Sequence, residues 1–301
     1  MINAVKNWYD RHFTRDESVI LFMILLGALL LLSVLGDVLM PVFVALVLAY
    51  LMQGVANQLQ KWGLSREFAL TGSTLIFVGV FFGFSLGVAP LAWRQFEGLI
   101  REAPAMMAAV QVQIEQIMAR YPLVIEQAPI TEMLSSLQGQ VASMGQALVG
   151  FGLASIPGVL TFLIYLVLIP LMLFFFLKDR AQLMTWALSF LPSERPALDQ
   201  IGRDVNVQIA NYVRGKGIEI AIMGSLSYVG FAAFGINYTA LLALLVGLSV
   251  IVPYIGAFLV TIPVVLVAFF QFGLMSHFYW VVGFYMLIQV LDGNVLVPVL
   301  F

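Results

Sequence analysis

The sequence predicts an all-α, polytopic membrane protein, and three observations support this. Hydrophobic residues make up 62% of the 301 residues and charged residues only 10%, with a mean hydropathy of +1.01. A soluble domain averages roughly 25% charged residues, so this chain has too few to cover a globular surface. Apolar runs of about 20 residues, the length of helix that crosses a bilayer, recur along it. We therefore expect lipid to be its main solvent.

Several classes of function are excluded by the same composition. The formal net charge is −2, and all 14 Lys and Arg residues lie at or before Lys216. We expect no basic face for nucleic acid. The chain has no cysteine, which excludes disulfide frameworks and thiolate metal sites. The sequence contains no HExxH, GxSxG, Walker or Rossmann motif. We therefore predict no enzyme, no catalytic residue and no cofactor, and we expect any transport to be driven by a gradient or by a partner's ATPase.

The apolar runs divide the chain into membrane and water-exposed parts. A cytoplasmic N-terminal segment (1–17) precedes three transmembrane helices within 18–90, and a fourth covers 149–177. Residues 220–291 contain no Asp, Glu, Lys or Arg, which gives room for at least three further crossings. The predicted spans are 18–36, 38–57, 68–90, 149–177, 218–236, 239–270 (broken near Pro253) and 276–291, with 294–301 beginning another segment. Residues 218–301 thus form a transmembrane region of broken helices.

Basic residues orient the chain with its N-terminus in the cytoplasm. Eleven lie in the predicted inside segments (1–17, 57–67 and 178–217), and three lie in the outside segment 91–148. Apolar residues recur at helical spacing in 91–148, which predicts extracytoplasmic amphipathic helices whose stripe packs on the same chain, the membrane surface or a neighbouring subunit. Residues 178–217 read as a cytoplasmic helical hairpin, with Trp186 as an interfacial anchor.

Polar residues within the apolar spans are the candidate functional residues, because they are costly in lipid and usually face a cavity. A carboxylate, Glu219, lies at the mouth of a span. Pro253 lacks an amide hydrogen and should break the next apolar stretch. Asp292 is the only acid after Glu219. The predicted substrate or ion pathway comprises Glu219, Pro253, Tyr254, Gly256, Gln289, Asp292, Gly293 and Asn294.

Each of these places also has a purely structural interpretation. Glu219 could form an interfacial ion pair with Lys216 or Arg214. Pro253 could simply kink a helix, and the segment around Asp292 could be a short surface loop. Paired interruptions favour a transporter binding region, since half-helix ends and freed carbonyls receive solutes there. The sequence leaves open whether 239–270 is one broken crossing or a re-entrant hairpin.

Four motifs in this order and spacing resemble the AI-2E (autoinducer-2 exporter) family, also called the PerM permease family. They are Leu171-Met172-Leu173-Phe174-Phe175-Phe176-Leu177-Lys178-Asp179-Arg180, Tyr212-Val213-Arg214-Gly215, Val252-Pro253-Tyr254-Ile255-Gly256 with Ile262-Pro263, and Leu291-Asp292-Gly293-Asn294-Val295-Leu296-Val297-Pro298. The resemblance implies about eight membrane helices, a bacterial inner-membrane location, solute export and a homo-oligomer, with a pentamer described in the family. Family members continue through a further helix, so we expect a C-terminal span beyond Phe301.

The resemblance does not fix the substrate, because roles in the family range from autoinducer-2 export to Na⁺/H⁺ antiport. The leading hypothesis is a secondary transporter, an exporter or permease, for a small polar solute. An oligomeric pore or a Na⁺/H⁺ antiporter is the alternative, and a non-transporting membrane scaffold is a further one. The expected partners are the lipid bilayer, a small polar solute or ion, and further copies of the chain.

Overall fold

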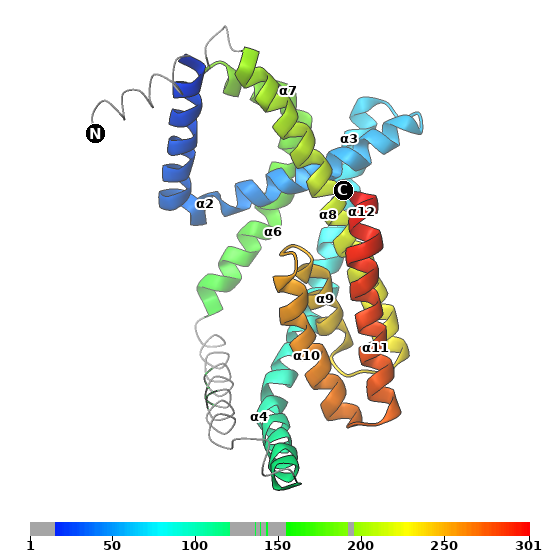
Figure 1. The fold of residues 1–301 in the computed structure, drawn as a ribbon. Helices are drawn as coiled ribbons and strands as arrows, with labels where there is room; N and C mark the ends of the chain where they lie inside the picture. The colour runs from blue at the N-terminus through cyan, green and yellow to red at the C-terminus, as the bar shows by residue number, and fades with distance from the viewer. Residues whose placement is uncertain (1–15, 121–135, 137–138, 140–142, 144–154, 192–195) are drawn as a thin grey trace, which may run out of the picture. The chain divides into compact units, whose positions relative to one another are not determined.

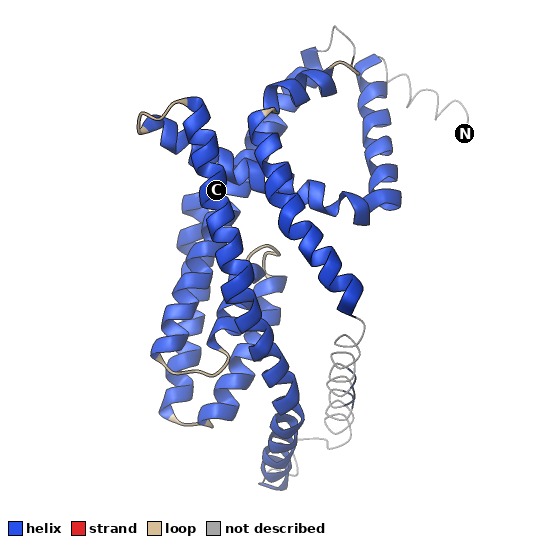
Figure 2. Ribbon diagram, turned by 180° about the vertical axis from the view of Figure 1, so that it is seen from behind, coloured by secondary structure: helices blue, strands red, loops and turns tan. Residues whose placement is uncertain are grey.

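All regular elements that the structure describes are helices, which confirms the predicted all-α class (Figures 1 and 2). The computed structural model describes residues 16–120, 136, 139, 143, 155–191 and 196–301. Most of the predicted N-terminal segment 1–17, and most of the second half of the predicted amphipathic region 91–148, therefore lie outside the described residues.

Five helices in the described part of the chain are long and apolar enough to cross a membrane. They are Val38–Lys61, Arg66–Ala109, Leu160–Lys178, Ile255–Phe272 and Ser276–Leu300. Thr239–Ser249 is a shorter apolar helix. Helices of this length and composition confirm that the chain is a polytopic membrane protein.

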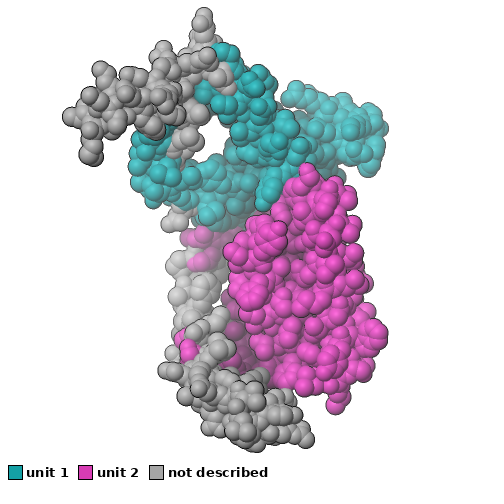
Figure 3. Space-filling model, in the orientation of Figure 1, with its two compact units in different colours: residues 1–79, 163–215 teal, residues 80–162, 216–301 magenta. Residues whose placement is uncertain are grey.

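The chain forms two compact units (Figure 3). Unit 1 consists of residues 1–79 and 163–215, and unit 2 of residues 80–162 and 216–301. Helix α2 (Asp16–Lys61) in unit 1 runs continuously through both predicted spans, 18–36 and 38–57. Figure 1 shows it as two arms that meet at a bend, and Pro41 is the proline inside it. A proline removes one backbone hydrogen bond and crowds the preceding turn, which bends a helix without ending it.

Two predicted boundaries between membrane and water fall inside continuous helices. Helix α3 (Arg66–Gly83) passes through a π-helical turn, η1 (Phe84–Val88), into α4 (Ala89–Arg120), so the chain does not break at residue 90. Helix α8 (Pro196–Ala233) likewise runs through the predicted boundary at residue 217. Helices α6 (Ser155–Lys178) and α7 (Arg180–Leu188) precede it. Sequence hydropathy marks where the solvent changes, whereas a helix can cross that boundary without interruption.

The core of unit 2 is a bundle of α8, α9 (Thr239–Ser249), α10 (Ile255–Phe272) and α11 (Ser276–Leu291). Its fully buried side chains include Met223, Phe231, Leu242, Val264 and Tyr285. Small residues let the helices approach closely. A Cβ on Gly247 of α9 would lie 3.1 Å from the Cα of Gly224 on α8, so the two backbones are in contact there.

Residues 239–270 form a helical hairpin and not one continuous helix, which favours the re-entrant alternative. Helix α9 ends at Ser249 and α10 begins at Ile255, packed against it. Gln271, near the end of α10, accepts a hydrogen bond from the Asn237 amide (2.7 Å) and donates one to the Gly235 carbonyl (2.7 Å). The beginning of α9 and the end of α10 therefore lie side by side. With 11 residues at 1.5 Å each, α9 is too short to cross a bilayer of about 30 Å.

The last helix does not break at Asp292, contrary to the expected interruption. It widens into a second π-helical turn, η2 (Asp292–Leu296), and continues as α12 (Val297–Leu300). Pro298 follows η2 by two residues, as Pro90 follows η1. Because a proline has no N–H for the carbonyl four residues earlier and its ring crowds that carbonyl, a local widening relieves the conflict. The polar residues there lie within a continuous helix and not in a loop.

Candidate functional site

Residues 216–301 contain three charged side chains, namely Lys216, Glu219 and Asp292, and the structure brings all three together within unit 2. Lys216 and Glu219 lie one turn apart on α8, so their side chains share a face of the helix. Asp292 reaches the pair from η2, at the end of α11. The hairpin arrangement of α9 and α10 makes this possible, because it returns α11 to the end of the bundle where Lys216 lies.

Lys216 is the centre of the cluster. Its Nζ donates to Glu219 Oε1 (3.0 Å) and lies 2.8 Å from Glu219 Oε2. It also donates to the carbonyl of Val250 (2.9 Å), just after the end of α9. The carbonyl end of a helix carries partial negative charge, so α9 helps to stabilise the ammonium group. The ring of Phe301 lies 5.2 Å from the same nitrogen, within the range of a cation–π contact.

Glu219 and Asp292 are the two carboxyl groups of this cluster. Glu219 is 1% exposed, and the Asp292 side chain lies close enough to interact with it electrostatically. Two ionised carboxylates carry only acceptors and repel each other, so a pair of buried carboxyl groups is favoured when it binds one proton. With one proton, the two carboxyl groups and the lysine have no net charge. Without it, the site holds one uncompensated negative charge.

Polar groups extend from the charged cluster into the apolar bundle. Gln289 lies one turn before Asp292 and one turn after Tyr285, so the three side chains share a face of the helix and Gln289 lies near the Tyr285 hydroxyl. That hydroxyl is 2.9 Å from Thr261 Oγ1 and 3.2 Å from the Ala257 carbonyl on α10. Tyr285 is fully buried. A polar track therefore connects α10 and α11 to the cluster through otherwise apolar packing.

Some buried polar atoms along this track have no hydrogen-bond partner within the described residues. They are one oxygen of Asp292 (Oδ1), the amide nitrogen of Gln289 (Nε2) and, further along α8, the hydroxyl of Ser227. Buried polar groups in proteins are almost always paired, and exceptions cluster where water, an ion or a substrate binds. Their position beside an ionisable pair marks this part of unit 2 as the candidate site.

The turn between α9 and α10 is held tightly beside the cluster. A Cβ on Gly256 would lie 1.9 Å from the Ser249 carbonyl oxygen, so only glycine fits this approach. The Gly256 amide donates to the Val252 carbonyl (2.9 Å), which closes the turn. Pro253 and Tyr254 form its tip, and Tyr254 adopts a positive φ of 62° with a 90% exposed side chain. The helix therefore breaks at Pro253, as the sequence analysis expected, and is not merely kinked.

The structure separates the predicted pathway residues into two groups. Glu219, Gln289 and Asp292 belong to the cluster or its polar extension, and Gly256 positions the turn beside it. Pro253, Tyr254, Gly293 and Asn294 are exposed within the described chain. Asn294 donates to the Val290 carbonyl (2.9 Å) and so satisfies a carbonyl of its own widened helix.

Sequence reasoning missed three participants, Lys216, Thr261 and Tyr285, as pathway residues. Lys216 was considered only as a possible structural partner of Glu219. Its position as the last basic residue of the chain, three residues before a carboxylate, was the available signal. For Tyr285 the spacing of four residues to Gln289 placed both on one helix face. No sequence signal connects Thr261 to either of them.

Spanning-length helices around buried ionisable groups define the class of protein, a polytopic membrane transporter. The chain belongs to the AI-2E transporter family, whose profile matches residues 19–301. It is 41% identical to the permease PerM of Escherichia coli strain K12 over 301 residues, which are all of this chain and 85% of PerM. It is 25% identical to the transport protein YueF of Bacillus subtilis strain 168 over 264 residues, which cover 86% of this chain and 70% of YueF.

Proposed function

We propose that the chain is a secondary transporter in which a small polar solute crosses unit 2 beside Lys216, Glu219 and Asp292, and in which the carboxyl pair binds one coupling proton. The observation that carries the proposal is the charge balance of the site. Three charged groups meet in an apolar bundle, and a single proton decides whether their sum is zero or minus one.

A site of this kind can couple a proton to movement. A buried net charge is strongly disfavoured in an apolar bundle, so the deprotonated cluster is more stable when it is open to water or to a cation. The protonated cluster can remain enclosed. Proton binding and release at Glu219 and Asp292 therefore favour two different arrangements of the surrounding helices, which is what a coupled carrier needs.

The neighbouring elements provide two discontinuities at which the helices can move. The hairpin turn at residues 250–254 presents a helix end and the Val250 carbonyl to Lys216. The π turn η2 carries Asp292, and π turns occur often at functional sites. Interrupted helices at the binding site are a common arrangement in secondary transporters.

Proton binding can be measured without knowing the solute. The purified chain is reconstituted in vesicles adsorbed on a solid-supported membrane, and the current after a jump in pH is recorded. The proposal predicts a transient current from proton binding and no sustained current under a potential. A pore would give a sustained current. Asp292→Asn should reduce the transient at least fivefold, because the carboxyl pair is lost.

Asp204→Asn is the matched control. Asp204 is exposed on α8 in unit 1, so its removal changes the charge by the same amount away from the cluster and should leave the transient unchanged. A full transient in Asp292→Asn would remove Asp292 from the mechanism.

We further propose that the protein is not an enzyme and lies in the bacterial inner membrane as a homo-oligomer with its N-terminus in the cytoplasm. The excess of basic residues in the predicted inside segments supports the orientation. Many large apolar side chains are exposed on the single chain, among them Phe68, Leu171 and Trp280. Lipid and neighbouring subunits are the surroundings that such side chains need.

A further inference from the structure

A groove in unit 1, distant in sequence from the proposed transport site, has the features of a lipid site. It has a volume of about 290 Å³ and lies between α2, α6 and α7. This is near the lower limit of ligand pockets, roughly 300–1,000 Å³, and fits a slender occupant. Leu46, Phe176, Leu183, Met184 and Trp186 supply most of its apolar lining.

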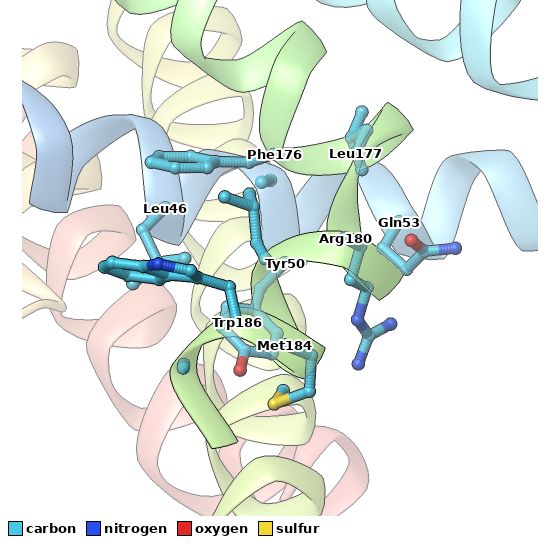
Figure 4. Close-up of a pocket in the computed structure, with 11 residues that line it drawn as sticks. Leu46, Tyr50, Gln53, Phe176, Leu177, Arg180, Met184 and Trp186 are labelled. Atoms are coloured by element: carbon cyan, nitrogen blue, oxygen red, sulfur yellow. The ribbon is translucent and has the colours of Figure 1, made fainter. Parts of the chain in front are cut away.

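The groove is apolar at one end and polar at the other. In the view of Figure 4, Phe176 and Trp186 face each other across one end, while Arg180 and Gln53 lie toward the other. The Tyr50 hydroxyl donates to Asn206 Oδ1 (2.9 Å), and Arg180 Nη2 lies 3.4 Å from the same oxygen. Within the described residues no carboxylate pairs with Arg180, so its charge is available to an anion.

The position of the groove along α6 indicates that it lies at the membrane–water interface. The spanning-length helix Leu160–Lys178 ends there, and α7 begins two residues later at Arg180. Helix α7 buries none of its described side chains, although Leu183, Met184 and Trp186 are apolar. Exposed apolar and Trp side chains beside basic residues at the end of a span are typical of the membrane–water interface.

We propose that this groove binds one acyl chain of an anionic glycerophospholipid, with the lipid phosphate on Arg180. The apolar end between Phe176 and Trp186 receives the hydrocarbon, and the Arg180 guanidinium and the Gln53 amide receive the headgroup oxygens. Basic pockets at the cytoplasmic ends of membrane helices recognise anionic lipid headgroups by the same chemistry. A zwitterionic lipid has the same chain but a weaker net attraction to Arg180.

Quenching of Trp186 fluorescence tests the proposal directly. The chain has five tryptophans, and Trp8, Trp62, Trp93 and Trp280 are replaced by Phe so that Trp186 alone reports. The protein is reconstituted in vesicles of unlabelled phosphatidylcholine. These vesicles contain increasing fractions of one lipid with brominated chains, which is either phosphatidylglycerol or phosphatidylcholine. Brominated phosphatidylglycerol should quench Trp186 at a roughly fivefold lower mole fraction than brominated phosphatidylcholine does. This factor is the effect of about one basic side chain at a membrane surface.

Two variants separate the Arg180 contact from a general effect of charge. Arg180→Gln should make the two brominated lipids equally effective, whereas Arg203→Gln, an exposed position on α8 in unit 1, should keep the preference. Glycerol phosphate added in solution should not displace the brominated lipid, because it has no chain to occupy the groove; displacement by it would indicate a site for free phosphate instead. Equal quenching in the parent protein, a preference that survives Arg180→Gln, or a Trp186 that neither lipid quenches would overturn the proposal.

A second measurement does not require the tryptophan replacements. Native mass spectrometry of the otherwise unchanged protein, purified with a mixture of phosphatidylglycerol and phosphatidylethanolamine, should show retained phosphatidylglycerol. The retained amount should fall about fivefold in Arg180→Gln and stay the same in Arg203→Gln. Equal retention by all three proteins contradicts a specific site.

Discussion

At the scale of single residues, the site depends on the groups that surround one lysine, Lys216. Lys216 contacts Glu219, the Val250 carbonyl and the Phe301 ring, while Asp292 lies close enough to interact with both charges. The sequence predicted that Glu219 and Asp292 are functional, because charges in apolar spans are costly. It could not predict that they meet. They are 73 positions apart, and only the path of the intervening hairpin determines the distance between them.

Tyr238 gives a residue-scale prediction outside the membrane spans. Burial, together with a hydrogen bond to Glu102 and that group's negative charge, raises the pKa of Tyr238 from 10.0 to about 12. The folded protein therefore holds this proton more tightly than the unfolded chain. The resulting stabilisation is complete below about pH 10 and is lost as the pH rises toward 12.

An ultraviolet titration at 295 nm tests this. The difference between the parent protein and Tyr238→Phe should show a tyrosine that ionises near pH 12. Glu102→Gln should move that ionisation toward lower pH, because a negative neighbour is removed. A Tyr238 component at the ordinary value of 10.0 in the parent protein would show that this contact does not form.

At the scale of elements, the hairpin of α9 and α10 and the two π turns are the features that position the site. The sequence predicted the break at Pro253 correctly, because a missing N–H is a local property. It predicted a break at Asp292 wrongly. Polar residues and a glycine resemble a loop, yet neighbouring turns kept the helix intact and Asn294 satisfied the Val290 carbonyl. Local polarity does not distinguish a widened helix from an interrupted one.

Gly256 and Gly283 provide a matched pair for testing the hairpin. Gly256→Ala places a methyl group 1.9 Å from a backbone carbonyl oxygen, which must force α9 and α10 apart. We expect it to lower the thermal unfolding temperature in detergent by several degrees and to weaken the pH-jump transient. Gly283→Ala meets no atom within 4 Å and replaces a poor helix former, so it should leave both unchanged or slightly raise stability. Equal stability of the two variants would contradict the close approach at Ser249.

The hairpin also makes a prediction about sidedness. Gln271, near the end of α10, is hydrogen-bonded to Asn237, which lies just before α9. Ser276 begins α11 shortly after α10 ends, and Gly293 lies beyond the other end of α11. Because the chain has no native cysteine, single cysteines at positions 237, 276 and 293 can be labelled with a membrane-impermeant maleimide. Positions 237 and 276 should react from one side of the membrane and 293 from the other. Labelling of 237 and 276 from opposite sides would mean that residues 239–270 form a single crossing.

At the scale of the whole molecule, the fold class followed from composition and the family from four motifs. The profile match over residues 19–301 and the 41% identity to PerM confirm that family. The division into two units could not be predicted, because its boundaries fall within α3, α6 and α8 and not at breaks in hydropathy. The two units carry separate features, the charged cluster in unit 2 and the groove beside Arg180 in unit 1.

The central claim is that Glu219 and Asp292 share one transported proton. It is tested most directly by the pH-jump transient of Glu219→Gln, Asp292→Asn and the double variant in reconstituted vesicles. Since one proton belongs to the pair, either single change should reduce the transient as much as the double change does, at least fivefold, and the two effects should be strongly non-additive. Two partial losses that simply add would mean that the carboxyl groups bind protons independently, and the proposed shared site would be wrong.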